Sequence, residues 1–130
     1  MRSSGPFEDR FAVQDLYSTY ADASSRGDRE VWLSLWADDA WWKTHLFERE
    51  GKAAITEQWD SIHDDLMTIA FLSQWGPIAV DGDRAAARSY VREIVRMWRM
   101  AAFSRSWALT MTRSSAAAAS GCSCAATTRR

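Results

Sequence analysis

Long apolar runs and cysteines are scarce in this sequence, and each scarcity removes a class of protein. No apolar stretch approaches the roughly 18 residues of a membrane helix, and the opening MRSSGPFEDR has no apolar run after its charges, so it is not a secretory signal. The sequence therefore predicts a cytoplasmic protein without a membrane segment. Cys122 and Cys124 are too few for a disulfide framework. As a lone C-x-C they fall short of the about four ligands of a zinc site, so no metal is expected.

Acidic residues are missing from the last part of the chain. All seventeen lie at or before Glu93, so residues 1–100, with twelve Lys/Arg, carry a net charge of −5. Residues 101–130 have four Arg and no acid, which gives +4. The whole-chain charge of −1 provides no field that would attract nucleic acid. A Gly-rich phosphate loop is also absent, so no nucleotide cofactor is expected.

Apolar and aromatic side chains, by contrast, are plentiful. Hydrophobic residues make up 47% of the chain and eight of them are Trp, which is enough for a packed core. A chain of 130 residues is the usual size of one domain.

Three segments have the spacing of amphipathic helices. In residues 7–27 the apolar side chains lie mostly three to five apart, and Gly27 suits the left-handed position that ends a helix. Asp28 is expected to cap a second helix over residues 29–39. A third helix is predicted over residues 52–66, from an apolar stripe of Ile55, Trp59, Ile62 and Leu66.

The other patterned segments favour strands. Residues 40–50 are rich in aromatics and predict a strand, one arm of a hairpin. Residues 67–80 look extended, with a Gly-Pro break. Asp81-Gly82-Asp83 has strong hairpin chemistry, which favours a strand for residues 84–97, although their Ala and Arg leave a helix as the alternative. Helices followed by antiparallel strands give an α+β fold.

The order and spacing of these segments match one known family. The stretch VQDLYSTYADASSRGDREVWLSLWADDA (13–40) combines a long helix, a G-D, a second helix and a D-D-A. Gly51 with Ala54-Ile55 and the segment IAVDGDRAAARSYVREIVR (78–96) follow. Together they resemble SnoaL-like domains of the nuclear transport factor 2-like superfamily, over about residues 8–97 after a tail of residues 1–7.

The resemblance implies a cone, in which three helices pack on a curved, mostly antiparallel sheet around an apolar pocket. It also implies a homodimer. Relatives include polyketide cyclases, scytalone dehydratase, hexachlorocyclohexane dehydrochlorinase, steroid isomerases and pure binding proteins, so the fold does not fix function. The first hypothesis for the function is a small-molecule pocket protein, which could be a lyase, isomerase or hydrolase acting on an apolar or cyclic substrate. The alternatives are a non-catalytic ligand-binding or dimerising member and a truncated product without function.

The catalytic pair of several relatives is absent. They place an Asp late in the first helix and a proton-abstracting His at the start of the third strand, and these positions align with Ser25 and Phe71. Phe has no proton site, and Ser cannot stabilise an imidazolium as a carboxylate does. Asp22 and Asp28 lie one helical turn to either side, so a slip of register would restore the acid without the His. Dehydratase or dehydrochlorinase chemistry is therefore disfavoured.

A few other residues are candidates for chemistry. His63, beside the apolar stripe of the third helix, could face the pocket as an acid or base; a helix-surface position is the simpler interpretation. Asp22 is the other catalytic candidate. His45 shares a strand face with Lys43, so the side chain of His45 is expected to face solvent. Asp38-Asp39 most simply ends a helix and starts a strand.

Seven aromatic residues are expected to line the pocket, because Tyr and Trp combine apolar area with a polar tip; ordinary core is the alternative for each. They are Tyr17, Tyr20, Trp36, Trp42, Phe71, Trp75 and Tyr90. Four arginines are expected on a solvated strand face: Arg88, Arg92, Arg96 and Arg99.

The segment 98–130 departs from every pattern above. Ala, Ser, Thr and Arg supply twenty-three of residues 101–130, which predicts a low-complexity, unstructured tail where the family has its two closing strands. In a shifted reading frame, each new codon consists of the last base of one codon and the first two bases of the next. Four of the new residues are fixed by the genetic code: Val at Met97–Trp98, Gly at Met100–Ala101, Gly at Trp107–Ala108 and Asp at Met111–Thr112. Within the permitted codons that frame can read G-x-Y-D-D-E and later W-L-F, which resembles the closing hairpin of the family. We therefore predict a frameshift near Met97; a natural extension is the alternative.

Overall fold

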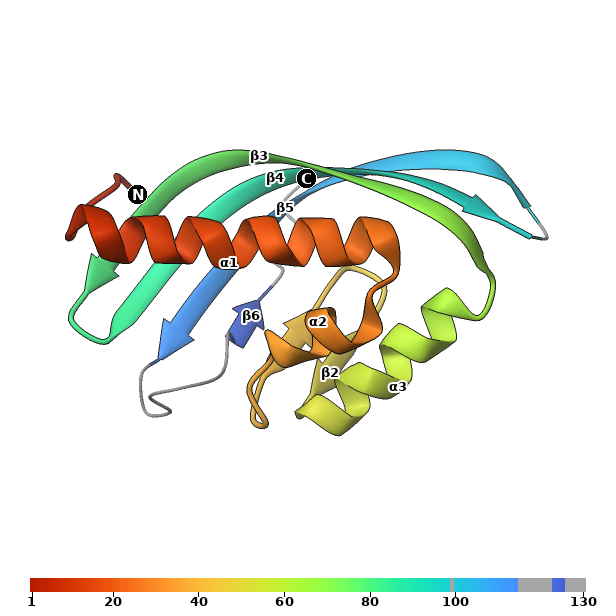
Figure 1. Ribbon diagram of the computed structural model, residues 1–130, viewed down its shortest axis with the longest axis horizontal. Helices are drawn as coiled ribbons and strands as arrows, with labels where there is room; N and C mark the ends of the chain where they lie inside the picture. The colour runs from red at the N-terminus through yellow and green to blue at the C-terminus, as the bar shows by residue number, and fades with distance from the viewer. Residues whose placement is uncertain (99, 115–122, 126–130) are drawn as a thin grey trace.

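A curved antiparallel sheet arches over three helices, and a smaller two-stranded sheet lies beside the helices (Figure 1). The computed structural model describes residues 1–98, 100–114 and 123–125, with side chains placed for residues 1–98. The four-stranded sheet has the order β3-β4-β5-β6 and the small sheet pairs β1 with β2. This is the α+β arrangement expected from the sequence.

The first helix, α1 (Phe7–Arg26), runs along the concave side of the sheet (Figure 1). Its buried side chains include Val13, Tyr17 and Tyr20, at intervals of four and three, so that one face of the helix packs against the sheet. Gly27 ends the helix with φ 66°, in the left-handed region that the sequence indicated.

Two shorter helices complete the helical layer. α2 (Arg29–Ser34) is capped by Asp28, whose carboxyl oxygen accepts from the backbone N–H of Val31 at 3.1 Å. α3 (Lys52–His63) is joined to α2 by Asp60, which accepts two hydrogen bonds from the guanidinium of Arg29 at 2.7 and 2.9 Å. The hydrogen bonds from Arg29 hold the pKa of Asp60 below its ordinary value.

The aromatic segment after α2 forms a complete small hairpin. β1 (Trp41–Lys43) pairs antiparallel with β2 (Glu48–Glu50), with Trp42 opposite Arg49. The sequence predicted a single strand here, one arm of a hairpin. Both arms instead lie within this segment, because Thr44 closes the connection by accepting from the backbone N–H of Phe47 at 3.1 Å.

The long central hairpin consists of β3 (Leu66–Asp81) and β4 (Arg84–Met97). The strand prediction for residues 84–97 is confirmed. β3 continues through the expected Gly-Pro break, with a shift of register between Trp75 and Ile78. Gly76 belongs at that shift, because a Cβ there would lie 2.7 Å from the carbonyl oxygen of Arg88.

The next strand corrects an expectation. β5 (Met100–Ser114) pairs with β4 from Arg84↔Ser114 to Met97↔Met100, and β6 (Ser123–Ala125) pairs with β5. The expectation that residues 101–130 contribute no strand is therefore wrong for these two segments. Composition was misleading because backbone pairing along an open edge of β4 needs no particular side-chain pattern. Within the described residues, one long strand and one very short strand lie where the family's closing hairpin was predicted to be missing.

The residues before α1 are tied to the sheet. Ser4 forms an isolated parallel bridge with Ala79, and the hydroxyl of Ser3 accepts from the backbone N–H of Ile78 at 3.2 Å. Arg99 and Cys122 lie outside the described residues, and so does the side chain of Cys124.

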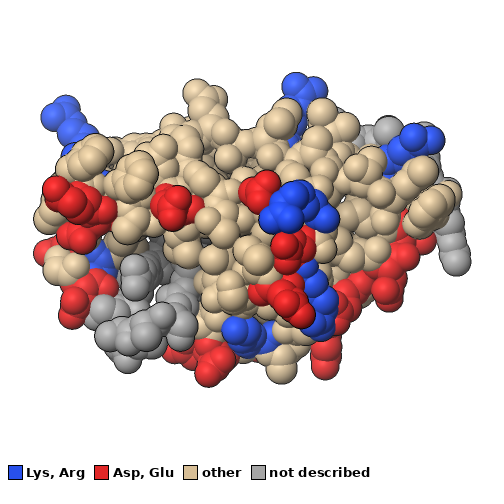
Figure 2. Space-filling model, viewed as in Figure 1, with Lys and Arg blue, Asp and Glu red and all other residues tan. Residues whose placement is uncertain are grey.

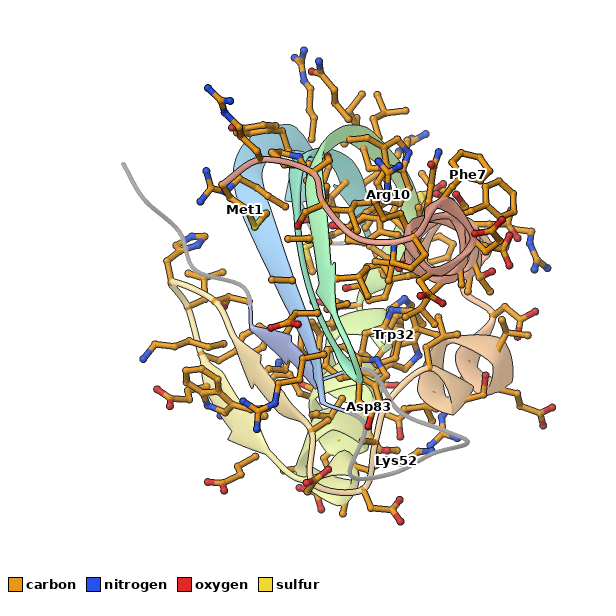
Figure 3. The ribbon with its side chains drawn as sticks, turned by 90° about the vertical axis from the view of Figure 1, so that its left-hand side faces the viewer. Met1, Phe7, Arg10, Trp32, Lys52 and Asp83 are labelled. Carbon is orange, nitrogen blue, oxygen red and sulfur yellow. The ribbon has the colours of Figure 1, made fainter. Side chains whose placement is uncertain are left out.

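Aromatic side chains dominate the core between the helices and the sheet. Trp32 is fully buried, and its ring centroid lies 4.2, 4.9 and 5.1 Å from those of Trp59, Trp36 and Trp42. Figure 3 shows Trp32 inside this layer and Phe7 on the outside of α1. No helix in the described part of the chain is long and apolar enough to cross a membrane.

Candidate functional site

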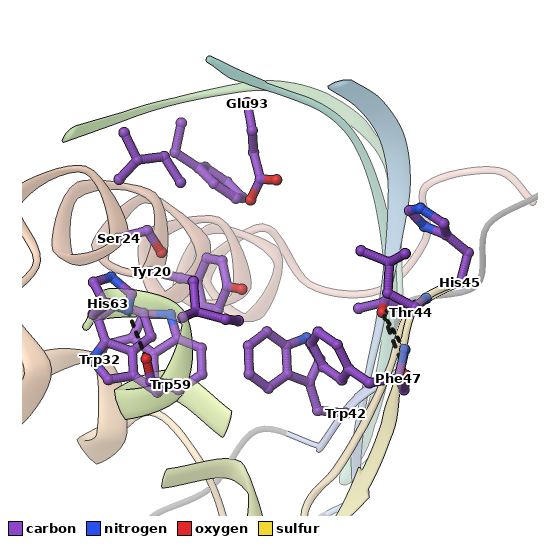
Figure 4. Close-up of a pocket in the computed structure, with 14 residues that line it drawn as sticks. Tyr20, Ser24, Trp32, Trp42, Thr44, His45, Phe47, Trp59, His63 and Glu93 are labelled. Carbon is purple, nitrogen blue, oxygen red and sulfur yellow. Dashed lines mark hydrogen bonds between the residues drawn. The ribbon is translucent and has the colours of Figure 1, made fainter. Parts of the chain in front are cut away.

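A cavity of about 60 Å³ lies between the helices, the small hairpin and the sheet (Figure 4). Helices α1, α2 and α3 supply Tyr20, Ser24, Trp32, Trp59, Ile62 and His63. The sheets and the β1–β2 connection supply Trp42, Thr44, His45, Leu46, Phe47, Ile69, Phe71 and Glu93. Most of these side chains are apolar or aromatic, so the cavity suits a small apolar group.

The carboxyl group of Glu93 is buried in the wall of this cavity, with only 7% of the residue exposed. Burial alternates along β4, and Glu93 shares the inward face with Ala87, Val91 and Val95. It lies directly opposite Phe71 on β3. Sequence reasoning missed this residue, although the alternation of β4 could have placed it on the apolar face.

His63 also lines the cavity, from the last turn of α3. Its ring stacks on Trp59 with centroids 3.7 Å apart, and its Nδ1 lies 2.9 Å from the carbonyl oxygen of Trp59. Because a carbonyl oxygen only accepts, Nδ1 carries the hydrogen of that bond. Nε2 is buried and has no hydrogen-bond partner in the described structure.

Ser25 and Phe71, the two positions that the sequence comparison aligned with an Asp and a His, are in contact. The hydroxyl of Ser25 accepts from the backbone N–H of Phe71 at 3.2 Å, which links the end of α1 to β3. The link holds the two elements together but gives no acid–base pair, because the Phe71 side chain cannot exchange a proton.

The neighbouring acids do not restore that pair. Asp22 is 62% exposed at its side chain and pairs with Arg26 at 2.9 Å, while Asp28 caps α2. Among the residues whose side chains the structure describes, no ion pair joins a His to a carboxylate. In that same part of the chain, no three His, Cys, Asp or Glu side chains gather into a metal site.

The expected pocket residues separate into three groups. Tyr20, Trp42 and Phe71 line the cavity. The second group belongs to the core around the cavity, where Tyr17 and Trp36 are buried and Trp75 is half-buried. The third group is Tyr90 alone.

Tyr90 requires a correction, because it is 53% exposed on the outer face of β4. The two-residue period of the strand sends Tyr90 outward when Glu93 and Val91 point inward. The same outer face carries Arg88, Arg92 and Arg96, all exposed. His45, expected to be in solvent, is exposed and borders the cavity mouth.

The charge on the helical face is dispersed. Figure 2 shows acidic groups along this face and separated basic groups between them. The exposed ion pairs there include Arg26–Asp22 and Arg29–Asp60.

Several solved structures share this fold. A protein provisionally named an aromatic ring hydroxylase, from Novosphingobium aromaticivorans, superposes with a TM-score of 0.86 at 21% identity, over 98% of this chain and 93% of that one. One provisionally named a scytalone dehydratase, from the same organism, has a TM-score of 0.81 at 15% identity, over 94% and 85%. The hexachlorocyclohexane dehydrochlorinase of Novosphingobium barchaimii has a TM-score of 0.80 at 15% identity, over 95% and 88%.

No curated protein matches the sequence. The model of the SnoaL-like domain family matches residues 6–114, which extends beyond the expected residues 8–97 into β5. The helices on a curved antiparallel sheet, the solved relatives and this match agree, and the chain belongs to the SnoaL-like domain family, with the nuclear transport factor 2-like fold.

Proposed function

We propose that this protein binds a small, mainly apolar ring compound in the cavity between its helices and sheet. The observation that carries the proposal is the wall itself, in which Trp32, Trp42 and Trp59 face a space of about 60 Å³. That volume suits a single ring better than a fused ring system. A lyase, isomerase or hydrolase acting on such a compound is the catalytic form of this function, with His63 as its candidate acid or base.

A non-catalytic binding protein is the second candidate. It is favoured by the contact between Ser25 and Phe71, which occupies the site of the relatives' acid–base pair without providing one. Binding of a ring compound is common to both candidates, so binding is tested first.

Toluene is a suitable probe, because it is one apolar ring without a hydrogen-bonding group. We expect saturable binding of toluene, measured by isothermal titration calorimetry. In Ile69→Phe the larger side chain fills part of the cavity, and we expect affinity to fall by roughly tenfold.

The matched control lies on the other face of the same strand. Leu72 is 55% exposed, so Leu72→Phe adds an aromatic ring outside the cavity and should leave binding unchanged. Equal loss of binding in both variants, or no binding by the wild type, would contradict the proposal.

We also propose a homodimer, a cytoplasmic location and a shifted reading frame after Met97. The dimer is supported by exposed apolar side chains on the outer face of the sheet, Leu72, Tyr90 and Ile94.

The shifted reading frame is supported by the absence of acidic residues after Glu93 and by the four residues, Val, Gly, Gly and Asp, that the genetic code fixes in that frame. Sequencing the gene across Met97 to Ala102 tests the frame, and an uninterrupted frame in closely related strains would contradict it.

A further inference from the structure

Three polar side-chain atoms without a partner belong to the wall of the cavity, and they come from three different elements. They are Nε1 of Trp32 on α2, Nε1 of Trp42 on β1 and Nε2 of His63 on α3, all buried without a hydrogen-bond partner among the described residues. The described side chains include only two other atoms of this kind, in Arg10 and Trp36, and neither residue lines the cavity. Buried polar groups are normally paired, so this concentration around one cavity indicates that a ligand supplies the missing partners.

Two of the three atoms are donors, because an indole N–H donates and cannot accept. Figure 4 shows Trp42 across the cavity from Glu93, with the nitrogen of its indole turned toward the interior. Glu93 accepts from neither indole, and it interacts with another group of the protein. The indoles of Trp32 and Trp42 lie with their centroids 5.1 Å apart, so a single acceptor of the right size can reach both.

The third atom is an acceptor. The Nδ1–H of His63 donates to the carbonyl oxygen of Trp59 at 2.9 Å, so a neutral ring presents a lone pair at Nε2. Stacking on Trp59, with ring centroids 3.7 Å apart, holds the imidazole in this position. The wall therefore requires two things of its ligand, which are an acceptor for the indoles and a donor for His63.

We infer that the cavity takes a single ring that contains an amide group. The carbonyl oxygen of the amide accepts from Trp32 and Trp42, and its N–H donates to Nε2 of His63. The inference rests on the proposed function, since it names the class of ring that the cavity binds. A carbonyl oxygen has two lone pairs, and a cyclic amide combines it with a separate donor in one uncharged ring. An apolar ring leaves all three protein atoms unpaired, which is the condition under which a site discriminates strongly.

Three compounds provide the test, because they share a planar six-membered ring and differ in its polar groups. 2-Pyridone has the carbonyl group and the N–H, N-methyl-2-pyridone lacks the donor, and toluene lacks both. We expect the wild type to bind 2-pyridone about tenfold more tightly than toluene, with N-methyl-2-pyridone between them, in titration calorimetry at one pH. Binding of none of the three would overturn the proposed function and this inference together. Toluene binding as tight as that of 2-pyridone would overturn only the selection of an amide.

Trp42→Phe assigns the preference to the indole N–H, because it keeps an aromatic ring and removes the donor. It should reduce the preference for 2-pyridone over toluene to below about threefold. Both ligands are measured on the same variant, so a change in stability alone does not alter their ratio. Trp41→Phe is the matched control, since the Trp41 indole donates to Glu48 at 2.9 Å outside the cavity, and it should leave the ratio intact. A ratio that is unchanged in Trp42→Phe, or equally reduced in both variants, would overturn the assignment.

His63→Phe tests the acceptor separately. Phe keeps a ring beside Trp59 but has no lone pair, so 2-pyridone and N-methyl-2-pyridone should bind this variant equally, and both more tightly than toluene. If the methyl group is disfavoured by its size alone, the preference for 2-pyridone over its N-methyl form will persist in His63→Phe. That persistence would overturn the role of His63 as the acceptor for the amide N–H.

Discussion

At the scale of single residues, burial and charge decide which side chains can act in the cavity. Asp22 and Asp28 have the right chemistry but are engaged with Arg26 and the α2 N-terminus. Glu93 has the same carboxyl group in the opposite setting, inside the wall. The sequence identified His63 as a candidate but not Glu93, because a charged residue between two arginines of β4 looks solvated until the alternation of the strand is followed inward.

Trp32 is expected to be the most sensitive core position. It is fully buried and contacts three other indoles, so Trp32→Ala should lower the free energy of unfolding by about 3–5 kcal/mol. Trp98, which is 68% exposed, is the control, and Trp98→Ala should change stability by less than about 0.5 kcal/mol. Urea denaturation measures both; similar losses in the two variants would contradict the packing described here.

The ion pair between α2 and α3 makes a prediction about pH. Arg29 lowers the pKa of Asp60, so Arg29→Gln should raise that pKa toward its ordinary value. The stabilisation is present above the pKa of Asp60 in the unfolded chain and is lost as the pH falls through the folded-state value. NMR titration of the Asp60 carboxyl group measures the change. Arg84→Gln, remote on β4, should leave it unaltered, and an unmoved pKa in Arg29→Gln would reject the pairing.

At the scale of elements, local chemistry predicted more than composition did. The Asp28 cap, the Gly27 helix end and the Asp81-Gly82-Asp83 turn each depend on interactions within a few residues of sequence. Each of them predicted an element boundary close to the one observed. β5 could not be predicted, because its place depends on the open edge of β4, which is a property of the assembled sheet. The cavity likewise depends on elements that are distant in sequence.

β5 is expected to be required for folding, whatever the origin of its sequence. Ending the chain after Met97 would expose the whole edge of β4 and should give an aggregating protein without a cooperative thermal transition. A chain ending after Ser114 keeps that pairing and should keep the transition. Calorimetry compares the two, and cooperative unfolding of the shorter chain would show that β5 contributes little.

At the scale of the whole molecule, the two faces of the sheet differ in the elements and side chains that lie on them. The concave face holds α1 (Figure 1). The aromatic core and the cavity lie between this face and the helices. The outer face exposes Leu72, Tyr90 and Ile94 between arginines. An exposed apolar patch of this kind is typical of a contact surface between proteins, which agrees with the proposed homodimer.

The homodimer is tested on that outer face. Leu72→Arg places a charge in the proposed interface, opposite Arg92 in the register of β3 and β4, and should shift the protein to a monomer in sedimentation equilibrium. Phe11→Arg changes an equally exposed apolar residue on α1 and should leave the mass unaltered. A wild type that sediments as a monomer at all concentrations would contradict the dimer.

The contact of Trp32 with Trp36, Trp42 and Trp59 has an optical consequence. Indoles at centroid distances of 4.2 to 5.1 Å exchange excitation energy faster than they emit, so these four rings behave as one coupled chromophore. The coupled rings include Trp59, whose indole stacks on the ring of His63. The folded protein should therefore show intense near-ultraviolet circular dichroism, which should fall when the cluster is taken apart.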